Sequence, residues 1–85
     1  MSKTIKTFER VSTTNEFHSA LGQYFNYRLA LKIRDPSRQL FLAVPQRIHQ
    51  GFFQIEFIQM ALQEAKVAIL VYDPEKEVIT AWEQF

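Results

Sequence analysis

The sequence predicts a mixed α/β (α+β) fold, with a strand–helix–strand crossover, a second short helix and a C-terminal β-hairpin in a single domain, residues 1–85. Three observations predict it. Residues 13–31 carry a long helical pattern with a strand pattern on each side. Residues 67–72 and 78–82 carry two further strand patterns, separated by a turn that contains proline. A helical crossover makes its strands parallel and a tight turn makes a hairpin antiparallel, so we expect a mixed four-stranded sheet.

The first strand and the long helix follow from residue spacing. Residues 3–8 alternate polar and apolar side chains, which is a weak strand pattern. Thr13 and Glu16 have the spacing of a capping box, so the helix should begin there. Apolar and long side chains then repeat at helical spacing along a stripe that should face a core: Phe17, Leu21, Tyr24, Arg28 and Leu31. The other flank is not cleanly polar either, so a second surface of the helix is expected against protein, in this chain or in a partner.

The remaining elements are shorter. Pro36 favours a turn after the helix, because proline biases the preceding residue away from helical geometry. Residues 39–44 form a nearly continuous apolar run, typical of a strand covered on both faces. Pro45 is suited to open a short helical turn and Gly51 to end it. Residues 55–65 repeat apolar side chains at helical spacing and predict the second helix.

Composition narrows the class of protein. The chain has 85 residues, no cysteine and two separated histidines, His18 and His49, so neither a disulfide nor a thiolate metal site is expected. The start of the sequence lacks the apolar run of a signal peptide, and no stretch approaches the roughly 20 apolar residues of a membrane span. We therefore expect a cytoplasmic protein without membrane contact.

Charge is distributed unevenly along the chain. The net charge is +1, but residues 1–50 hold eight Lys or Arg against three Asp or Glu, and residues 51–85 hold two against six. A basic half and an acidic half favour complementary association, and a basic half also favours a nucleic-acid backbone. An ordinary mixed surface is the alternative, because no block of like charge occurs.

Three segments of the sequence resemble a known family. They are ALGQYFNYR at residues 20–28, LFLAVP at residues 40–45 and LVYDPEKEVITAW at residues 70–82. In this order they are similar to the C-terminal part of the XisH family, the fdxN element excision controlling factors of cyanobacteria. The resemblance covers nearly the whole chain but not the whole family, whose members carry a helix and a β-hairpin before the segment that matches residues 3–8. We therefore expect a truncated or naturally short relative.

The resemblance implies a truncated restriction-endonuclease-like fold of the PD-(D/E)XK type. Such a fold carries an aspartate on one strand and Glu-x-Lys on the next, and the carboxylates hold a divalent metal that activates water. Lys6 matches the family's lysine, whereas Thr4 stands where the glutamate should be, and the aspartate strand is not matched. A neutral hydroxyl is a poor magnesium ligand. We therefore expect no bound metal, no other cofactor and no metal-dependent nuclease activity.

Gln23 and Tyr27 form a second resemblance, to the Q-x-x-x-Y motif of RecB-type nucleases. One helical turn separates them, so both polar tips share one face and could orient a lysine or contact a DNA phosphate. The alternative is that they satisfy buried backbone groups, or each other, at the contact between helix and sheet. The aromatic side chains are interpreted as core rather than as a stacking platform for single strands: Phe52, Phe53, Phe57 and Trp82.

Three hypotheses for function remain. The first is a noncatalytic XisH-like interaction module that acts with a XisI-like protein in the site-specific excision of a DNA element. The second is DNA binding without cleavage through basic residues near the end of the long helix: Arg28, Lys32, Arg34 and Arg38. The third is a nuclease completed by a partner subunit that supplies acidic residues. An unpaired edge on the first strand also predicts a homo-oligomer or a complex with another chain.

Overall fold

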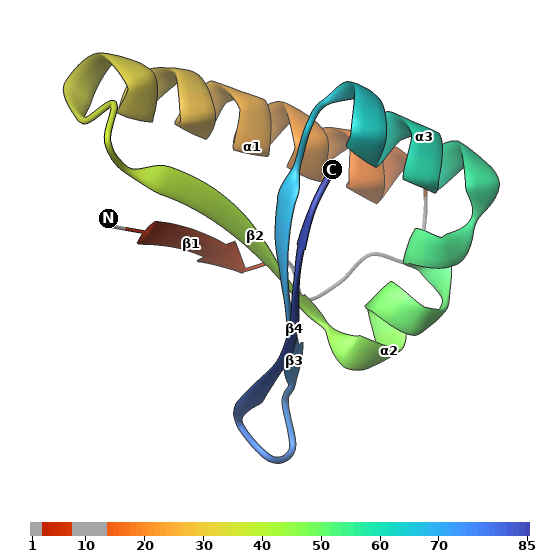
Figure 1. Ribbon diagram of the computed structural model, residues 1–85. Coiled ribbons are helices and arrows are strands. Elements are labelled where there is room, and N and C mark those ends of the chain that lie inside the picture. The colour runs from red at the N-terminus through yellow and green to blue at the C-terminus, as the bar shows by residue number, and fades with distance from the viewer. Residues whose placement is uncertain (1–2, 8–13) are drawn as a thin grey trace.

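The computed structural model describes residues 3–7 and 14–85, and the mixed α/β (α+β) fold class is confirmed. The crossover consists of β1 (Lys3–Thr7), α1 (Thr14–Arg34) and β2 (Gln39–Pro45). The short helix α2 (Gln46–Gln50), the 3₁₀ helix η1 (Phe52–Gln54) and α3 (Glu56–Glu64) follow. The hairpin of β3 (Ala68–Asp73) and β4 (Val78–Gln84) completes the fold (Figure 1).

The sheet follows the order β1-β2-β3-β4, so β1 and β4 are its edges. β3 pairs antiparallel with β4, as the sequence predicts, and β2 pairs in parallel with β3, which the sequence analysis did not predict. The backbone of β1 joins the outer side of β2 in parallel, with Ile5 opposite Phe41. The register between β2 and β3 begins only at Leu42 and Ile69, and Figure 1 shows the two strands separating toward their N-terminal ends.

The long helix α1 extends three residues beyond its predicted end and stops at Arg34. The Asp35 N–H still donates to the Leu31 carbonyl at 2.7 Å, and Pro36 then prevents continuation of the helix. Phe17 and Tyr24 on the predicted core stripe are fully buried against the sheet, and Leu21, Arg28 and Leu31 are half-buried. The predicted capping residue Thr13 lies outside the described residues.

All three α-helices pack on one face of the sheet. That face holds a cluster of buried residues from α1, α2, η1, α3 and alternate positions of β2 and β3. Phe17 lies at its centre, with ring centroids 5.7 Å from Phe52 and 5.8 Å from Phe53, both edge to face. Burying side chains of this size contributes about 1.5–3 kcal/mol each, so this face supplies most of the stabilisation of the fold.

The opposite face of the sheet holds a second, smaller cluster made only of strand residues. Its members alternate with those of the first cluster and are Phe41, Ala43, Ala68 and Leu70, with Tyr72 packed against them. The strand β2 is therefore buried on both faces, as its continuous apolar run predicts. No α-helix of the described residues contributes to this second cluster, although its four members are only 3–5% exposed. We call this side of the sheet, which lacks a helical layer among the described residues, the open sheet face.

The β3–β4 hairpin projects away from the helices (Figure 1). The Asp73 side chain closes its turn by accepting hydrogen bonds from the backbone N–H groups of Glu75, at 2.9 Å, and Lys76, at 3.3 Å. Glu77 follows with a φ of 54°, in the left-handed region that usually takes glycine. Within the described residues, no helix is long and apolar enough to cross a membrane.

Candidate functional site

Tyr24 is a polar anchor in the contact between α1 and the sheet. Its hydroxyl donates to the Leu40 carbonyl at 3.0 Å and accepts from the Ala68 N–H at 3.1 Å. These two groups belong to β2 and β3 just before the register between the strands begins. The hydroxyl therefore bridges the strands where they separate. The sequence predicts only that Tyr24 is buried, because spacing gives no information about this bond.

The separation of β2 and β3 leaves a groove beside the C-terminal half of α1. It has a volume of about 590 Å³ and is lined by α1, by the start of β2 and by the residues that lead into β3. We call it the basic groove, because its lining includes four cationic residues and no carboxylate: Arg28, Lys32, Arg38 and Lys66. Three of the four DNA-binding candidates predicted from the sequence therefore share one groove. Arg34 is exposed on α1 and does not line it.

Arg28 is held in position at the wall of the basic groove. Its Nη1 donates to the Lys66 carbonyl at 3.0 Å. Its guanidinium carbon lies 5.3 Å from the centroid of the Tyr24 ring and 5.6 Å from that of Phe25. These are cation–π distances, so the guanidinium is restrained by two rings and one carbonyl.

Lys66 occupies a backbone position that usually takes glycine. Its φ is 52°, and the Val67 N–H donates to the Leu62 carbonyl while the Lys66 N–H donates to the Gln63 carbonyl. This is a Schellman motif with Lys66 as the left-handed residue that ends α3. The sequence analysis did not identify Lys66 as a candidate, because no glycine marks the end of α3. Its position 42 residues after Tyr24 also separates it from the rest of the groove.

Arg38 has a carboxylate beside it. Its Nε lies 3.4 Å from Oδ2 of Asp35, and both side chains are partly exposed. The Ser37 hydroxyl donates to the other oxygen of Asp35 at 2.7 Å. Asp35 therefore offsets part of the positive charge at this end of the basic groove.

The predicted motif positions lie on two different elements. Thr4 and Lys6 lie in β1, and their backbones are in register with Leu40 and Leu42 of β2. Gln23 and Tyr27 lie on α1, and both are exposed, Tyr27 by 50%. Tyr24, which lies between them in the sequence, bonds backbone groups of the sheet, and both interpretations of Gln23 and Tyr27 stay predictions.

The described residues contain no group of three or more His, Cys, Asp or Glu side chains arranged to hold a metal ion. His49 is paired with Glu83, with Nε2 and Oε1 3.1 Å apart, which links α2 to β4. His18 lies near Phe57, with ring centroids 6.0 Å apart.

Several apolar side chains are exposed on and around the open sheet face. Trp82 packs edge-on against Phe41, with centroids 5.0 Å apart, but remains 46% exposed. Phe57 of α3 is 55% exposed, so the interpretation of Trp82 and Phe57 as core is wrong, whereas Phe53 is fully buried. Ile5 and Ile79 are each about half exposed, and Ile79 lies opposite Tyr72 in the register.

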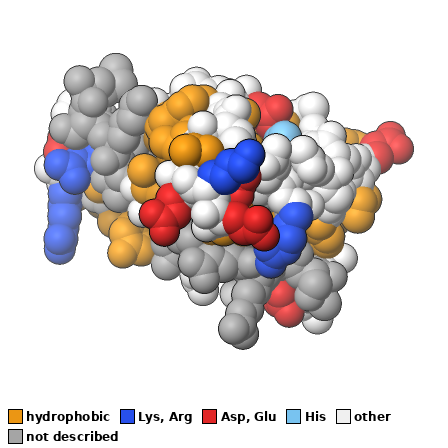
Figure 2. Space-filling view, turned by 90° about the horizontal axis from the view of Figure 1, so that it is seen from below, with side chains coloured by type: hydrophobic (Ala, Val, Ile, Leu, Met, Phe, Trp, Pro, Cys, Tyr) orange, Lys and Arg blue, Asp and Glu red, His pale blue; other side chains and the backbone are white. Residues whose placement is uncertain are grey.

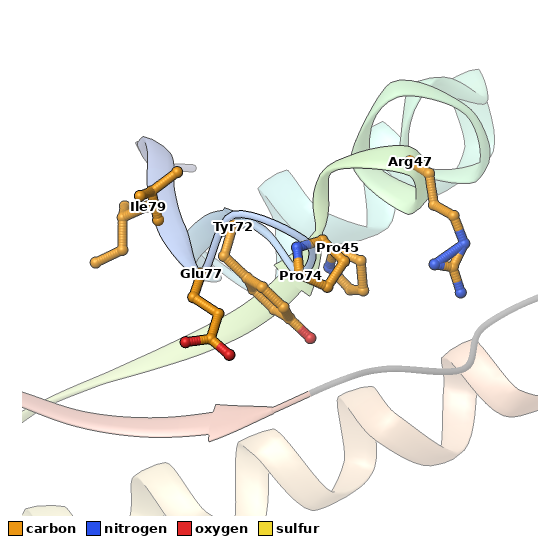
Figure 3. Close-up of a pocket in the computed structure, with 7 residues that line it drawn as sticks. Pro45, Arg47, Tyr72, Pro74, Glu77 and Ile79 are labelled. Atoms are coloured by element: carbon orange, nitrogen blue, oxygen red, sulfur yellow. The ribbon is translucent and has the colours of Figure 1, made fainter.

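A second hollow lies where β2 and β3 end, and we call it the apolar hollow. Its volume is about 590 Å³, and its lining includes Pro45, Tyr72, Pro74, Val78 and Ile79. Figure 3 shows Arg47 of α2 and Glu77 of the hairpin turn on opposite sides of the two prolines and Tyr72. Seen from the hairpin end, acidic, basic and hydrophobic side chains are mixed on the surface (Figure 2).

These features define a small mixed α/β domain with helices on one face of a sheet, an opposite face without helices among the described residues, a basic groove and an apolar hollow. The XisH protein family model matches residues 3–80, and the chain belongs to the XisH family. The family resemblance seen in the sequence is thereby confirmed. The wider relation to PD-(D/E)XK nucleases stays a prediction.

Two solved structures are similar to the chain over most of its length. One is an XisH family protein from Nostoc punctiforme PCC 73102, with 42% identity and a TM-score of 0.86 over 92% of this chain. The other is a fdxN element excision controlling factor protein from Anabaena variabilis, with 46% identity and a TM-score of 0.83 over 94% of this chain. The chain spans 63% of the length of each. A comparison with curated proteins gave no match.

Proposed function

We propose that this chain is a noncatalytic excision-controlling factor, a protein-interaction module that acts with a XisI-like partner in the site-specific excision of a DNA element. Membership of the XisH family supports the general role, and the relative from Anabaena variabilis is named as a controlling factor of this kind. The chain spans 63% of that relative, so the role is carried over as a proposal.

The observation that carries the interaction role is the open sheet face. Ile79 and Trp82 of β4 lie on this face and are 50% and 46% exposed. Protein interfaces are enriched in aromatic side chains at their centre, and large exposed apolar patches mark interaction sites. Trp82 already packs edge-on against Phe41. A partner that covers this face would bury the part of Trp82 that is still exposed.

The apolar hollow adds a place for one apolar side chain of the partner. Two prolines, Tyr72 and Ile79 form its walls, and Arg47 and Glu77 add one charge of each sign. A buried anchor within a polar rim is the arrangement in which a few residues contribute most of the binding free energy. The partner surface is therefore expected to present an apolar or aromatic side chain among mixed charges.

Co-purification with a XisI-like protein tests the proposal. The double variant Val78→Thr, Ile79→Thr keeps β-branched side chains in β4 but lowers the apolar area of the open sheet face at Ile79 and of the apolar hollow at Val78. We expect it to lose the partner while remaining folded. The control is Ile33→Gln on α1, which changes a more exposed apolar residue, 85% exposed, on the helical side.

Retention of the partner by the β4 double variant, or its loss by Ile33→Gln alone, would contradict the assignment of the open sheet face. Absence of any complex between the wild-type chain and the XisI-like protein would contradict the proposed function itself.

The noncatalytic part of the proposal depends on Thr4, which stands where the resemblance places a metal-binding glutamate. Incubation of the pure chain with plasmid DNA and magnesium or manganese is expected to leave the DNA intact. Incision that disappears in Lys6→Ala would contradict this. Incision only after addition of the XisI-like protein would instead support a nuclease completed by its partner.

A further inference from the structure

We propose that the basic groove binds the phosphate backbone of nucleic acid, with Lys32, Arg38 and Lys66 as charge contacts and Arg28 as a fixed donor. This goes beyond the proposed function, because it gives the chain a DNA contact that needs no partner protein. The chain as a whole has a net charge of only +1. The groove lining nevertheless includes two Arg and two Lys and no Asp or Glu, so positive charge is concentrated here.

The groove is built into the fold rather than formed by flexible side chains alone. Its cations come from α1, from the turn that leads into β2 and, far along the sequence, from the residue that ends α3. The hydroxyl of Tyr24 holds these segments together where β2 and β3 separate. Arg28 is further restrained by the Lys66 carbonyl and by two aromatic rings. A donor that is already positioned loses less conformational entropy when it binds an anion.

The backbone at Lys66 is an independent indication of function. A residue with a side chain is strained at a φ of 52°, and glycine would relieve this strain. The chain instead places a lysine there, and this residue lines the same groove as Arg28 and Lys32. Backbone strain of this kind is concentrated at functional sites. We infer that the lysine at this position contributes through its charge and not through the stability of α3.

The exposure of the cations indicates a polymer rather than a small anion. Lys32, Arg38 and Lys66 are exposed and Arg28 is half-buried, so a small phosphate in the groove would keep much of its surface in water. A nucleic-acid strand can instead contact all of them from outside. Arg28 and Lys32 are one helical turn apart, which is roughly 6 Å along the axis of α1. Each strand of a duplex carries one phosphate per roughly 3.4 Å of the duplex axis, so the spacing of the two side chains is close to that of two phosphate steps. Both side chains can therefore reach phosphates of one strand.

Binding of a fluorescent 30-base-pair duplex of random sequence to the full chain tests the proposal, measured by anisotropy over a series of NaCl concentrations. The groove variant is Lys32→Gln, Lys66→Gly. The matched control is Arg34→Gln, Lys76→Gln, which removes the same charge from exposed positions outside the groove lining. We expect the groove variant to bind at least about tenfold more weakly and its salt slope to fall by about 1 per lost phosphate contact. The control should remain close to wild type.

Lys66→Gly separates binding from folding. Because glycine relieves the left-handed strain, this single variant should unfold at a temperature equal to or above that of wild type while binding DNA more weakly. Equal losses of affinity in the groove and control variants, or wild-type binding that does not depend on salt, would overturn the proposal. Inorganic phosphate that displaces the duplex more strongly than chloride does at equal ionic strength would also overturn the proposal, because the ligand would then be a small anion.

Discussion

Replacing Tyr24 by Phe removes one oxygen atom from the contact between α1 and the sheet. The Leu40 carbonyl then loses a donor at 3.0 Å and the Ala68 N–H loses an acceptor at 3.1 Å, and all three residues are at most 5% exposed. A lost hydrogen bond costs about 0.5–1.5 kcal/mol, and a buried group left unsatisfied costs about 1–3 kcal/mol. We therefore expect the free energy of unfolding to fall by about 2–4 kcal/mol. A domain of this size has roughly 4–13 kcal/mol in total.

Urea unfolding followed by circular dichroism measures this loss. With a slope of about 2 kcal/mol per molar urea, the midpoint should fall by roughly 1–2 M without a change in slope. The control is Tyr27→Phe, one turn further along α1, where the side chain is 50% exposed and water can replace a lost bond. A loss below about 0.5 kcal/mol in Tyr24→Phe would show that water from the basic groove replaces the hydroxyl, and the bridging role would be refuted.

The other predictions concern the core, the hairpin turn and association. Phe17→Ala should lower the free energy of unfolding by about 3–5 kcal/mol in the same assay, whereas Phe57→Ala on the exposed side of α3 should cost about 1 kcal/mol or less. Glu77→Gly should raise stability by up to about 1 kcal/mol because it relieves a φ of 54°, and Lys76→Gly, where φ is not positive, should not. Light scattering should detect a dimer or a larger complex, because β1 and β4 are sheet edges. A single monomeric species at high concentration would contradict this.

The order of the elements could be predicted from the sequence because it depends on local periodicity. The apolar run of β2, the helical turn after Pro45 and the helical spacing of α3 each correspond to an observed element. The buried stripe of α1 was also predicted, and Phe17 and Tyr24 lie on it. The 3₁₀ helix η1 was not predicted, because three residues are too few to show a period.

The candidate site was only partly accessible from the sequence, because it depends on contacts between distant segments. The clustering of Arg28, Lys32 and Arg38 followed from their closeness in the chain. The participation of Lys66 depends on where the end of α3 meets α1, at the bond from Arg28 to the Lys66 carbonyl, and neither the charge of Lys66 nor its neighbours in the sequence indicates that. Trp82 was misassigned for a similar reason: periodicity places it on a sheet face but gives no information on whether another layer covers that face.

The division of the hydrophobic residues into two clusters has a consequence for how the surface can change over evolutionary time. The strands separate Leu42, Val44 and Ile69 on the helical side from Phe41, Ala43 and Leu70 on the open side. Substitutions at residues that do not share neighbours usually have additive effects on stability. Lineages can therefore alter β4 to suit a changing binding partner while the helical packing around Phe17 stays as it is.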